Sequence, residues 1–285
     1  MTVTPAVVEE EEEAPKKKVL SFKFPPEETE MGIIAGIIGA VIVIFTGLPA
    51  VIKGVGLILV LLWGMDSVRK TSKYGLGTGV PSIGVLSTGY GVVGALMGLA
   101  VAEYGRVGQL YPAVLVGVIV MGVIGLVSGA ISNSEKFIAM KIPKLERGMM
   151  ELGMAGTLAI LLECSIVTGS LNFNAVVNQV MNTGLIALMF IFNCFAMLHP
   201  YNACLGPDER RERTRMCGIE ISGLVCVLLG FAQLALGTSP YGPLDAVSMI
   251  VFGAIVFAVF FWKFIKACLD EAYETVGTGM IKTIE

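Results

Sequence analysis

The sequence carries little charge for its length. Of its 285 residues, 15% are Asp, Glu, Lys or Arg, whereas soluble globular domains contain roughly 25%. Hydrophobic residues make up 55% of the chain, and the mean hydropathy is +0.79. This composition excludes a cytosolic enzyme, a secreted disulfide-bonded scaffold and a nucleic-acid-binding domain. It predicts an integral membrane protein.

Residues that hold metals or perform catalysis are also scarce. The sequence contains a single histidine, His199, and no Cys-x-x-Cys pair. A zinc site needs three or four protein ligands, and no nucleophile, base and acid occur together. We therefore expect no metal site, no disulfide framework and no catalytic residue in this chain. The six cysteines are Cys164, Cys194, Cys204, Cys217, Cys226 and Cys268.

The N-terminal region lacks the features of a cleaved signal peptide, because no cationic start, short apolar stretch and small-residue cleavage site occur there. Residues 9–13 are all glutamate, and residues 16–18 are all lysine. Residues 1–30 are therefore expected to form a charged, partly disordered cytoplasmic tail. Residues 31–268 are expected to form the transmembrane helical domain, and residues 269–285 a cytoplasmic C-terminal tail.

Long apolar runs are the main positive feature of the sequence. About 20 apolar residues in a helix cross a hydrocarbon core of roughly 30 Å. The predicted fold class is an all-α, polytopic transmembrane helical bundle of about eight spans, one of which is re-entrant or broken in one interpretation. The apolar segments run through residues 31–49, 54–68, 83–104, 108–132, 149–169, 179–198, 217–237 and 244–266.

The distribution of cations tests this count independently of hydropathy. Cytoplasmic loops of membrane proteins are enriched in Lys and Arg. With eight spans and a cytoplasmic N-terminus, only Lys53 and Arg106 of the 20 Lys and Arg residues fall outside. We therefore predict that both termini face the cytoplasm and that the protein is a multi-pass protein of the cell membrane.

Glycine and proline are concentrated in residues 74–91. Six glycines and one proline in this segment make a continuous helix unfavourable, at about 1 kcal/mol per glycine and 3 kcal/mol per proline. One interpretation is a broken or re-entrant helix, whose freed backbone groups bind ions in transporters. The other is a glycine-rich loop leading into a tightly packed third helix. The candidate break residues are Gly77, Gly79, Pro81 and Gly84.

Glu163 is the strongest single polar signal, because it lies well inside the fifth apolar segment. A charged carboxylate near the centre of a membrane helix costs about 2.5–3.5 kcal/mol on insertion scales. It should therefore be paired, be protonated or face a cavity. Glu163 either relays a cation or proton, or is a structural carboxyl that is hydrogen-bonded within the bundle or to a neighbouring subunit.

Three further polar residues lie within apolar segments. Glu151 and Glu220 lie near the cytoplasmic ends of their helices, where the helix dipole favours an acidic side chain. Asn193 fits an interhelical hydrogen bond better than a substrate contact. All three are weaker candidates for an ion path or a buried polar position than Glu163.

A short motif near the inner face predicts an ordered turn. Residues 199–210 begin with His-Pro and continue through Gly-Pro, and they could present a docking surface to a partner. The candidate docking residues are His199, Pro200, Asn202, Gly206 and Pro207.

Residues 199–209, residues 77–84 and the eight-span layout resemble the C subunit of tetrahydromethanopterin S-methyltransferase, a membrane complex of methanogenic archaea. The resemblance covers nearly the whole chain. It implies a complex that transfers a methyl group from methyl-tetrahydromethanopterin to coenzyme M through a corrinoid (cobamide) on another subunit. The same complex is expected to translocate Na⁺ out of the cell.

The resemblance further implies that subunits of types C, D and E form the membrane part of the complex. This chain would bind no cofactor itself; it would supply membrane scaffold and a candidate part of the Na⁺ path. Inner loops 133–148 and 199–216 would contact the partners. Two alternatives remain open at this point. One is a free-standing secondary transporter of ions or solutes, and the other is a scaffold without any ion contact.

Overall fold

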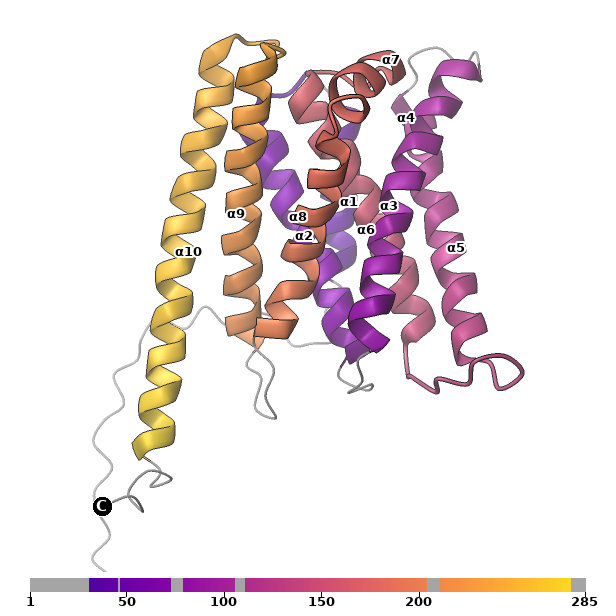
Figure 1. Cartoon of the computed structure of the whole chain (residues 1–285), viewed down its shortest axis with the longest axis vertical. Helices are drawn as coiled ribbons and strands as arrows, with labels where there is room; N and C mark the ends of the chain where they lie inside the picture. The colour runs from indigo at the N-terminus through magenta and orange to yellow at the C-terminus, as the bar shows by residue number, and fades with distance from the viewer. Residues whose placement is uncertain (1–30, 46, 73–78, 106–110, 204–210, 278–285) are drawn as a thin grey trace, which may run out of the picture.

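The computed structural model describes residues 31–45, 47–72, 79–105, 111–203 and 211–277, and within these ranges the chain is helical with no strand (Figure 1). The predicted all-α fold is confirmed. The helices are α1 (Met31–Ile44), α2 (Ala50–Ser72), α3 (Gly79–Tyr104), α4 (Tyr111–Val114), α5 (Val116–Asn133), α6 (Leu145–Thr168), α7 (Phe173–Val176), the π-helix η1 (Val177–Met181), α8 (Leu185–Ala203), α9 (Arg211–Leu236) and α10 (Pro243–Gly277).

Each of the eight predicted apolar segments corresponds to a helix or a helix pair. Six helices are long and apolar enough to cross a membrane, and the bent pair 173–181 and 185–200 makes a seventh candidate span. The remaining segment is α1, which is shorter, with 14 residues. A helix of that length measures about 21 Å, so α1 is shorter than a hydrocarbon core of roughly 30 Å.

The break in the bundle does not lie at the described candidate residues of the glycine-rich segment, for which the sequence left open either a broken helix or a loop leading into a packed helix. Residues Gly79, Pro81 and Gly84 belong to the continuous helix α3, and Gly77 lies outside the described residues. Pro81 is tolerated because it lies in the first turn, where backbone N–H groups have no partner inside the helix. The observed break follows η1, where the chain bends by 82°.

Helix α6 occupies the centre of the bundle and packs against α2, α3 and α5. Glycine makes these contacts close. A Cβ atom added to Gly91 of α3 would lie 2.7 Å from the carbonyl oxygen of Gly156 on α6, and one on Gly125 of α5 would lie 2.7 Å from the carbonyl carbon of Met149. Membrane helices associate through such close fit.

Helices α9 and α10 form a long antiparallel hairpin at one side of the molecule (Figure 1). Their backbones approach closely at Gly223 and Gly253, since a Cβ on Gly253 would lie 2.6 Å from the carbonyl oxygen of Gly223. Helix α10 continues to Gly277, so part of the predicted C-terminal tail is helical.

The loop between α5 and α6 is held by one side chain. The Asn133 side chain accepts a hydrogen bond from the backbone N–H of Ile142 at 2.9 Å and donates one to the Ile142 carbonyl at 2.7 Å. The clamped loop leaves Phe137 and Ile138 exposed. Apolar side chains at this position suit an interfacial or a partner contact.

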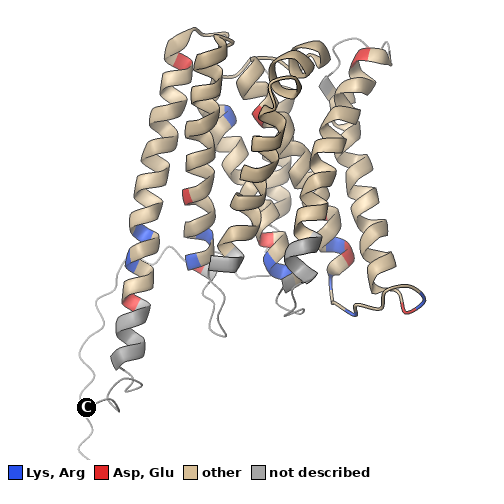
Figure 2. Ribbon diagram, viewed as in Figure 1, with Lys and Arg blue, Asp and Glu red and all other residues tan. Residues whose placement is uncertain are grey.

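Charge is distributed unevenly between the two ends of the bundle. Figure 2 shows the Lys and Arg residues of the described helices gathered mainly at the end of the bundle where α2 ends and α6 begins. Lys70 is at the end of α2, Arg147 at the start of α6 and Arg215 at the start of α9. This arrangement agrees with the predicted division of the loops into a cation-rich and a cation-poor set.

Candidate functional site

Glu163 is held at the contact between α6 and α8, and its side chain is completely buried. The Asn193 side chain of α8, which is also completely buried, donates a hydrogen bond from Nδ2 to Oε2 of Glu163 at 3.1 Å. The sequence prediction that Asn193 makes an interhelical hydrogen bond is met by this contact. Both residues lie within candidate membrane spans.

Two oxygen atoms of this pair lack a hydrogen-bond partner among the described residues. They are Oε1 of Glu163 and Oδ1 of Asn193. Buried polar atoms are nearly always hydrogen-bonded, and an isolated ionised carboxylate in an apolar interior is strongly disfavoured. Glu163 is therefore stable there either as a neutral carboxylic acid or beside a bound cation. Carboxylate and amide oxygens are ligands that hard cations prefer.

A second buried polar group lies at the N-terminal end of α2, far from the Lys and Arg residues of its last turn. The sequence pattern did not indicate this group. Lys53 is expected from the sequence in the turn between the first two segments, but it lies in the first turn of α2 and is 2% exposed. Its Nζ donates to the carbonyl oxygen of Ser165 on α6 at 3.0 Å. A charged residue at the start of an apolar run is weak evidence of burial, because such a residue fits an exposed turn equally well.

Asp245 completes this group from α10. Its Oδ1 accepts a hydrogen bond from the backbone N–H of Ala50 at 2.9 Å, and its Oδ2 accepts from Ser239 at 3.0 Å and from Gln233 at 3.4 Å. Asp245 thus caps the N-terminus of α2, where the helix dipole favours a negative charge. Lys53 interacts electrostatically with the same carboxylate. We interpret this group as structural.

Glu151 joins α6 to α2 near the cation-rich end. Its carboxylate accepts hydrogen bonds from Ser67 at 2.5 Å, from the indole nitrogen of Trp63 at 3.1 Å and from Arg147 at 2.7 Å. Lys70 lies 3.7 Å away. The carboxylate is fully engaged by the residues around it, as expected for a structural role. Twelve residues separate Glu151 from Glu163, which corresponds to roughly 18 Å along the helix.

The other candidates are not brought to Glu163. Glu220 lies half-buried on α9, and its Oε2 atom has no hydrogen-bond partner among the residues that the structure describes. His199 and Pro200 are in the last turns of α8 rather than in the predicted turn, and the helix includes Asn202. Pro200 has no backbone N–H to donate to the carbonyl of residue 196, yet the helix continues past it to Ala203. Gly206 and Pro207 lie outside the described residues.

The described residues contain no group of three or more His, Cys, Asp or Glu side chains that could hold a metal ion. The cysteines among them, Cys164, Cys194, Cys217, Cys226 and Cys268, form no disulfide bond with one another, and Cys204 lies outside the described residues. The geometry therefore offers a completely buried carboxylate, Glu163, with one oxygen that has no partner among the described residues, whereas Glu151 and Asp245 are engaged by neighbouring groups. The fold and this site define a polytopic α-helical membrane protein built around a buried acidic helix.

Comparison with known proteins narrows this class. Residues 9–285 match the family of the C subunit of tetrahydromethanopterin S-methyltransferase. The C subunit of Methanosarcina barkeri is 39% identical over 265 residues, which cover 92% of this chain and 94% of the relative. The C subunit of Methanopyrus kandleri is 35% identical over 250 residues, covering 88% and 86%. The chain belongs to this family, a family of membrane subunits of a methyltransferase of methanogenesis.

Proposed function

We propose that this chain is a non-catalytic membrane subunit of a sodium-translocating methyltransferase complex. The complex transfers a methyl group from methyl-tetrahydromethanopterin to coenzyme M, and a corrinoid on another subunit relays the methyl group. Family membership supports the assignment to the complex. The chain's own residues are consistent with a role apart from the chemistry, since the described part consists of membrane helices and short connections.

The observation that gives this chain a role in ion movement is the state of Glu163. A carboxylate that is completely buried, with one oxygen that has no hydrogen-bond partner in the described part of the chain, can exchange a proton or a cation when the surrounding helices move. We propose that Glu163 and Asn193 line part of the Na⁺ path. Glu151 supports the same helix at its other end, and Glu220 is a weaker candidate for the path.

The partners are other membrane subunits of types D and E, the corrinoid-carrying subunit and the lipid bilayer. Loop 133–148, with Phe137 and Ile138 exposed, and loop 199–216 are proposed as contacts for the subunits at the inner face. Methylation and demethylation of the corrinoid protein would alter its docking on these loops, and the bundle would convert the change into ion access. Both termini are proposed to face the cytoplasm, on the basis of the cation-rich end.

The first experiment is purification of the chain from its native membrane in mild detergent, followed by mass spectrometry of all co-purifying proteins. Recovery with a corrinoid-bearing protein and several membrane subunits, together with Na⁺-dependent methyl transfer by the preparation, is the expected result. Recovery of this chain alone, with Na⁺ or solute flux in liposomes, would instead establish the alternative of a free-standing secondary transporter. The bent pair 173–181 and 185–200 is the feature that favours that alternative.

A further inference from the structure

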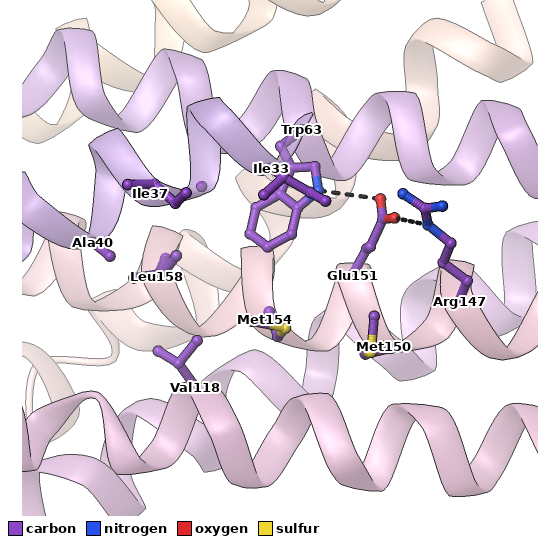
Figure 3. A pocket seen from close by; sticks show the side chains of 11 residues that line it. Ile33, Ile37, Ala40, Trp63, Val118, Arg147, Met150, Glu151, Met154 and Leu158 are labelled. Atoms are coloured by element: carbon purple, nitrogen blue, oxygen red, sulfur yellow. Dashed lines mark hydrogen bonds and ion pairs between the residues drawn. The ribbon is translucent and has the colours of Figure 1, made fainter. Parts of the chain in front are cut away.

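A cavity of about 440 Å³ opens beside α6, on the side where α1 and α5 border it (Figure 3). Its walls come from four helices and are formed mainly by apolar side chains. Ile37 at its edge is exposed, whereas Trp63 and Leu158 are buried. The cavity is therefore a slot that opens on the lateral surface of the helix bundle. Two of the helices that line it, α2 and α6, are candidate membrane spans.

Apart from Arg147, the side chains that line the slot offer no hydrogen bond that a polar ligand could use. The two polar groups that could do so, the Trp63 indole N–H and the Glu151 carboxylate, are bonded to each other at 3.1 Å. Glu151 also accepts the Arg147 hydrogen bond at 2.7 Å (Figure 3). Met150 and Met154 supply flexible thioether side chains, which adapt to irregular apolar ligands. The interior thus matches a hydrocarbon chain.

One end of the slot is cationic. Arg147 and Lys70 both approach the Glu151 carboxylate, and their side chains are 46% and 25% exposed. The two cations therefore reach the surface of the bundle, whereas the carboxylate between them is buried. This end is the cation-rich end of the helices, which we expect at the level of the headgroups of one leaflet. Its positive surface complements an anionic headgroup.

We propose that the slot between α1, α5 and α6 binds one chain of an anionic membrane lipid, with the lipid phosphate against Arg147 and Lys70. The site is independent of the proposed Na⁺ path, because Glu151 is engaged with Trp63, Ser67 and Arg147 and Glu163 lies roughly 18 Å further along α6. The bound lipid would fill the space beside the central helix and couple its packing to the surrounding membrane.

Trp63 provides a direct probe, because the chain has only two tryptophans. The exposed Trp262 is first replaced (Trp262→Phe), and the full chain is placed in phosphatidylcholine vesicles that contain a small fraction of lipid with brominated chains. Bromine quenches tryptophan fluorescence at short range. We expect brominated phosphatidylglycerol, which is anionic, to quench Trp63 at least twice as strongly as brominated phosphatidylcholine.

Variants separate occupation of the slot from general exposure to lipid. Ala40→Phe should fill the slot and reduce the quenching by brominated phosphatidylglycerol to the level seen with brominated phosphatidylcholine. If Ala40→Phe prevents folding, the smaller substitution Ala40→Leu takes its place and should give an intermediate quenching. Ala254→Phe, at an exposed position on α10, is the matched control and should change nothing. Arg147→Gln should abolish the preference for the anionic lipid, whereas Arg147→Lys should retain it.

Two results would overturn the proposal. The first is equal quenching by the two brominated lipids in the Trp262→Phe protein, which would show that the headgroup charge is not recognised. The second is quenching by phosphatidylglycerol that neither Ala40 variant reduces, which would show that the bromine reaches Trp63 from outside the slot.

Discussion

The buried Asn193 side chain donates to one carboxylate oxygen of Glu163 at 3.1 Å and leaves the other carboxylate oxygen without a hydrogen-bond partner among the described residues. The pair joins α6 to α8, the helix that follows the 82° bend. A movement at the bend would therefore act directly on the environment of the carboxylate. This relationship gives the proposed Na⁺ path its location and its most direct test.

Replacement of Glu163 by glutamine should preserve the fold and impair ion coupling. Glutamine has the same shape and can still accept the hydrogen bond from Asn193, but it cannot carry a charge. We expect the Na⁺ concentration for half-maximal methyl transfer by the purified complex to rise at least tenfold, which corresponds to about 1.4 kcal/mol. The control is Glu103→Gln, at an exposed carboxylate on α3. Unchanged Na⁺ dependence in the Glu163→Gln complex would remove Glu163 from the path.

The contact between α3 and α6 should tolerate no side chain at Gly91. A Cβ atom at this position would approach the Gly156 backbone to 2.7 Å or less, so Gly91→Ala should destabilise the protein by about 1–3 kcal/mol. Gly89→Ala is the matched control on the same helix, because its Cβ would meet only Phe190, at 3.8 Å. Thermal unfolding in detergent should show a lower midpoint for Gly91→Ala. An equal or higher midpoint would contradict the close packing described.

The ion pair between Asp66 and Arg215 should matter more than an exposed one. The two groups lie 3.4 Å apart, and their side chains are 9% and 10% exposed. Asp66→Ala leaves a largely buried guanidinium without this carboxylate, and removal of one partner of a buried pair costs about 3 kcal/mol. Glu135→Ala breaks the exposed pair with Lys141 and should cost about 0.5 kcal/mol or less. Comparable losses of thermal stability in the two variants would show that burial does not distinguish the pairs.

The orientation of the chain can be tested with cysteines at its two ends. Glu135→Cys lies in the exposed loop after α5, and Asn182→Cys lies at the exposed bend after η1. We expect a membrane-impermeant maleimide to label the Asn182→Cys protein in intact cells, and the Glu135→Cys protein only in inside-out vesicles. The natural protein, whose Cys164, Cys217 and Cys226 are buried, gives the background. The reverse pattern would place both termini outside.

Much of the fold could be predicted from the sequence, because hydrophobicity and the positions of Lys and Arg are local properties. The apolar segments correspond to the helices. The break was harder to predict. Gly79, Pro81 and Gly84 disfavour a helix individually, yet they lie in the continuous helix α3. The bend after η1 occurs in a segment with a single glycine, Gly184.

The sequence by itself determined that this protein is an α-helical membrane protein and that Glu163 needs a partner, a proton or a cavity, because an isolated charged carboxylate is costly near the centre of a membrane helix. Only the tertiary structure decided which side chain meets it. Asn193 is 30 residues from Glu163 along the chain. Lys53 is buried in the bundle, where its ammonium group donates a hydrogen bond to the Ser165 carbonyl of α6. Such pairings depend on how the helices pack, and the packing is set by contacts between residues that are distant in sequence.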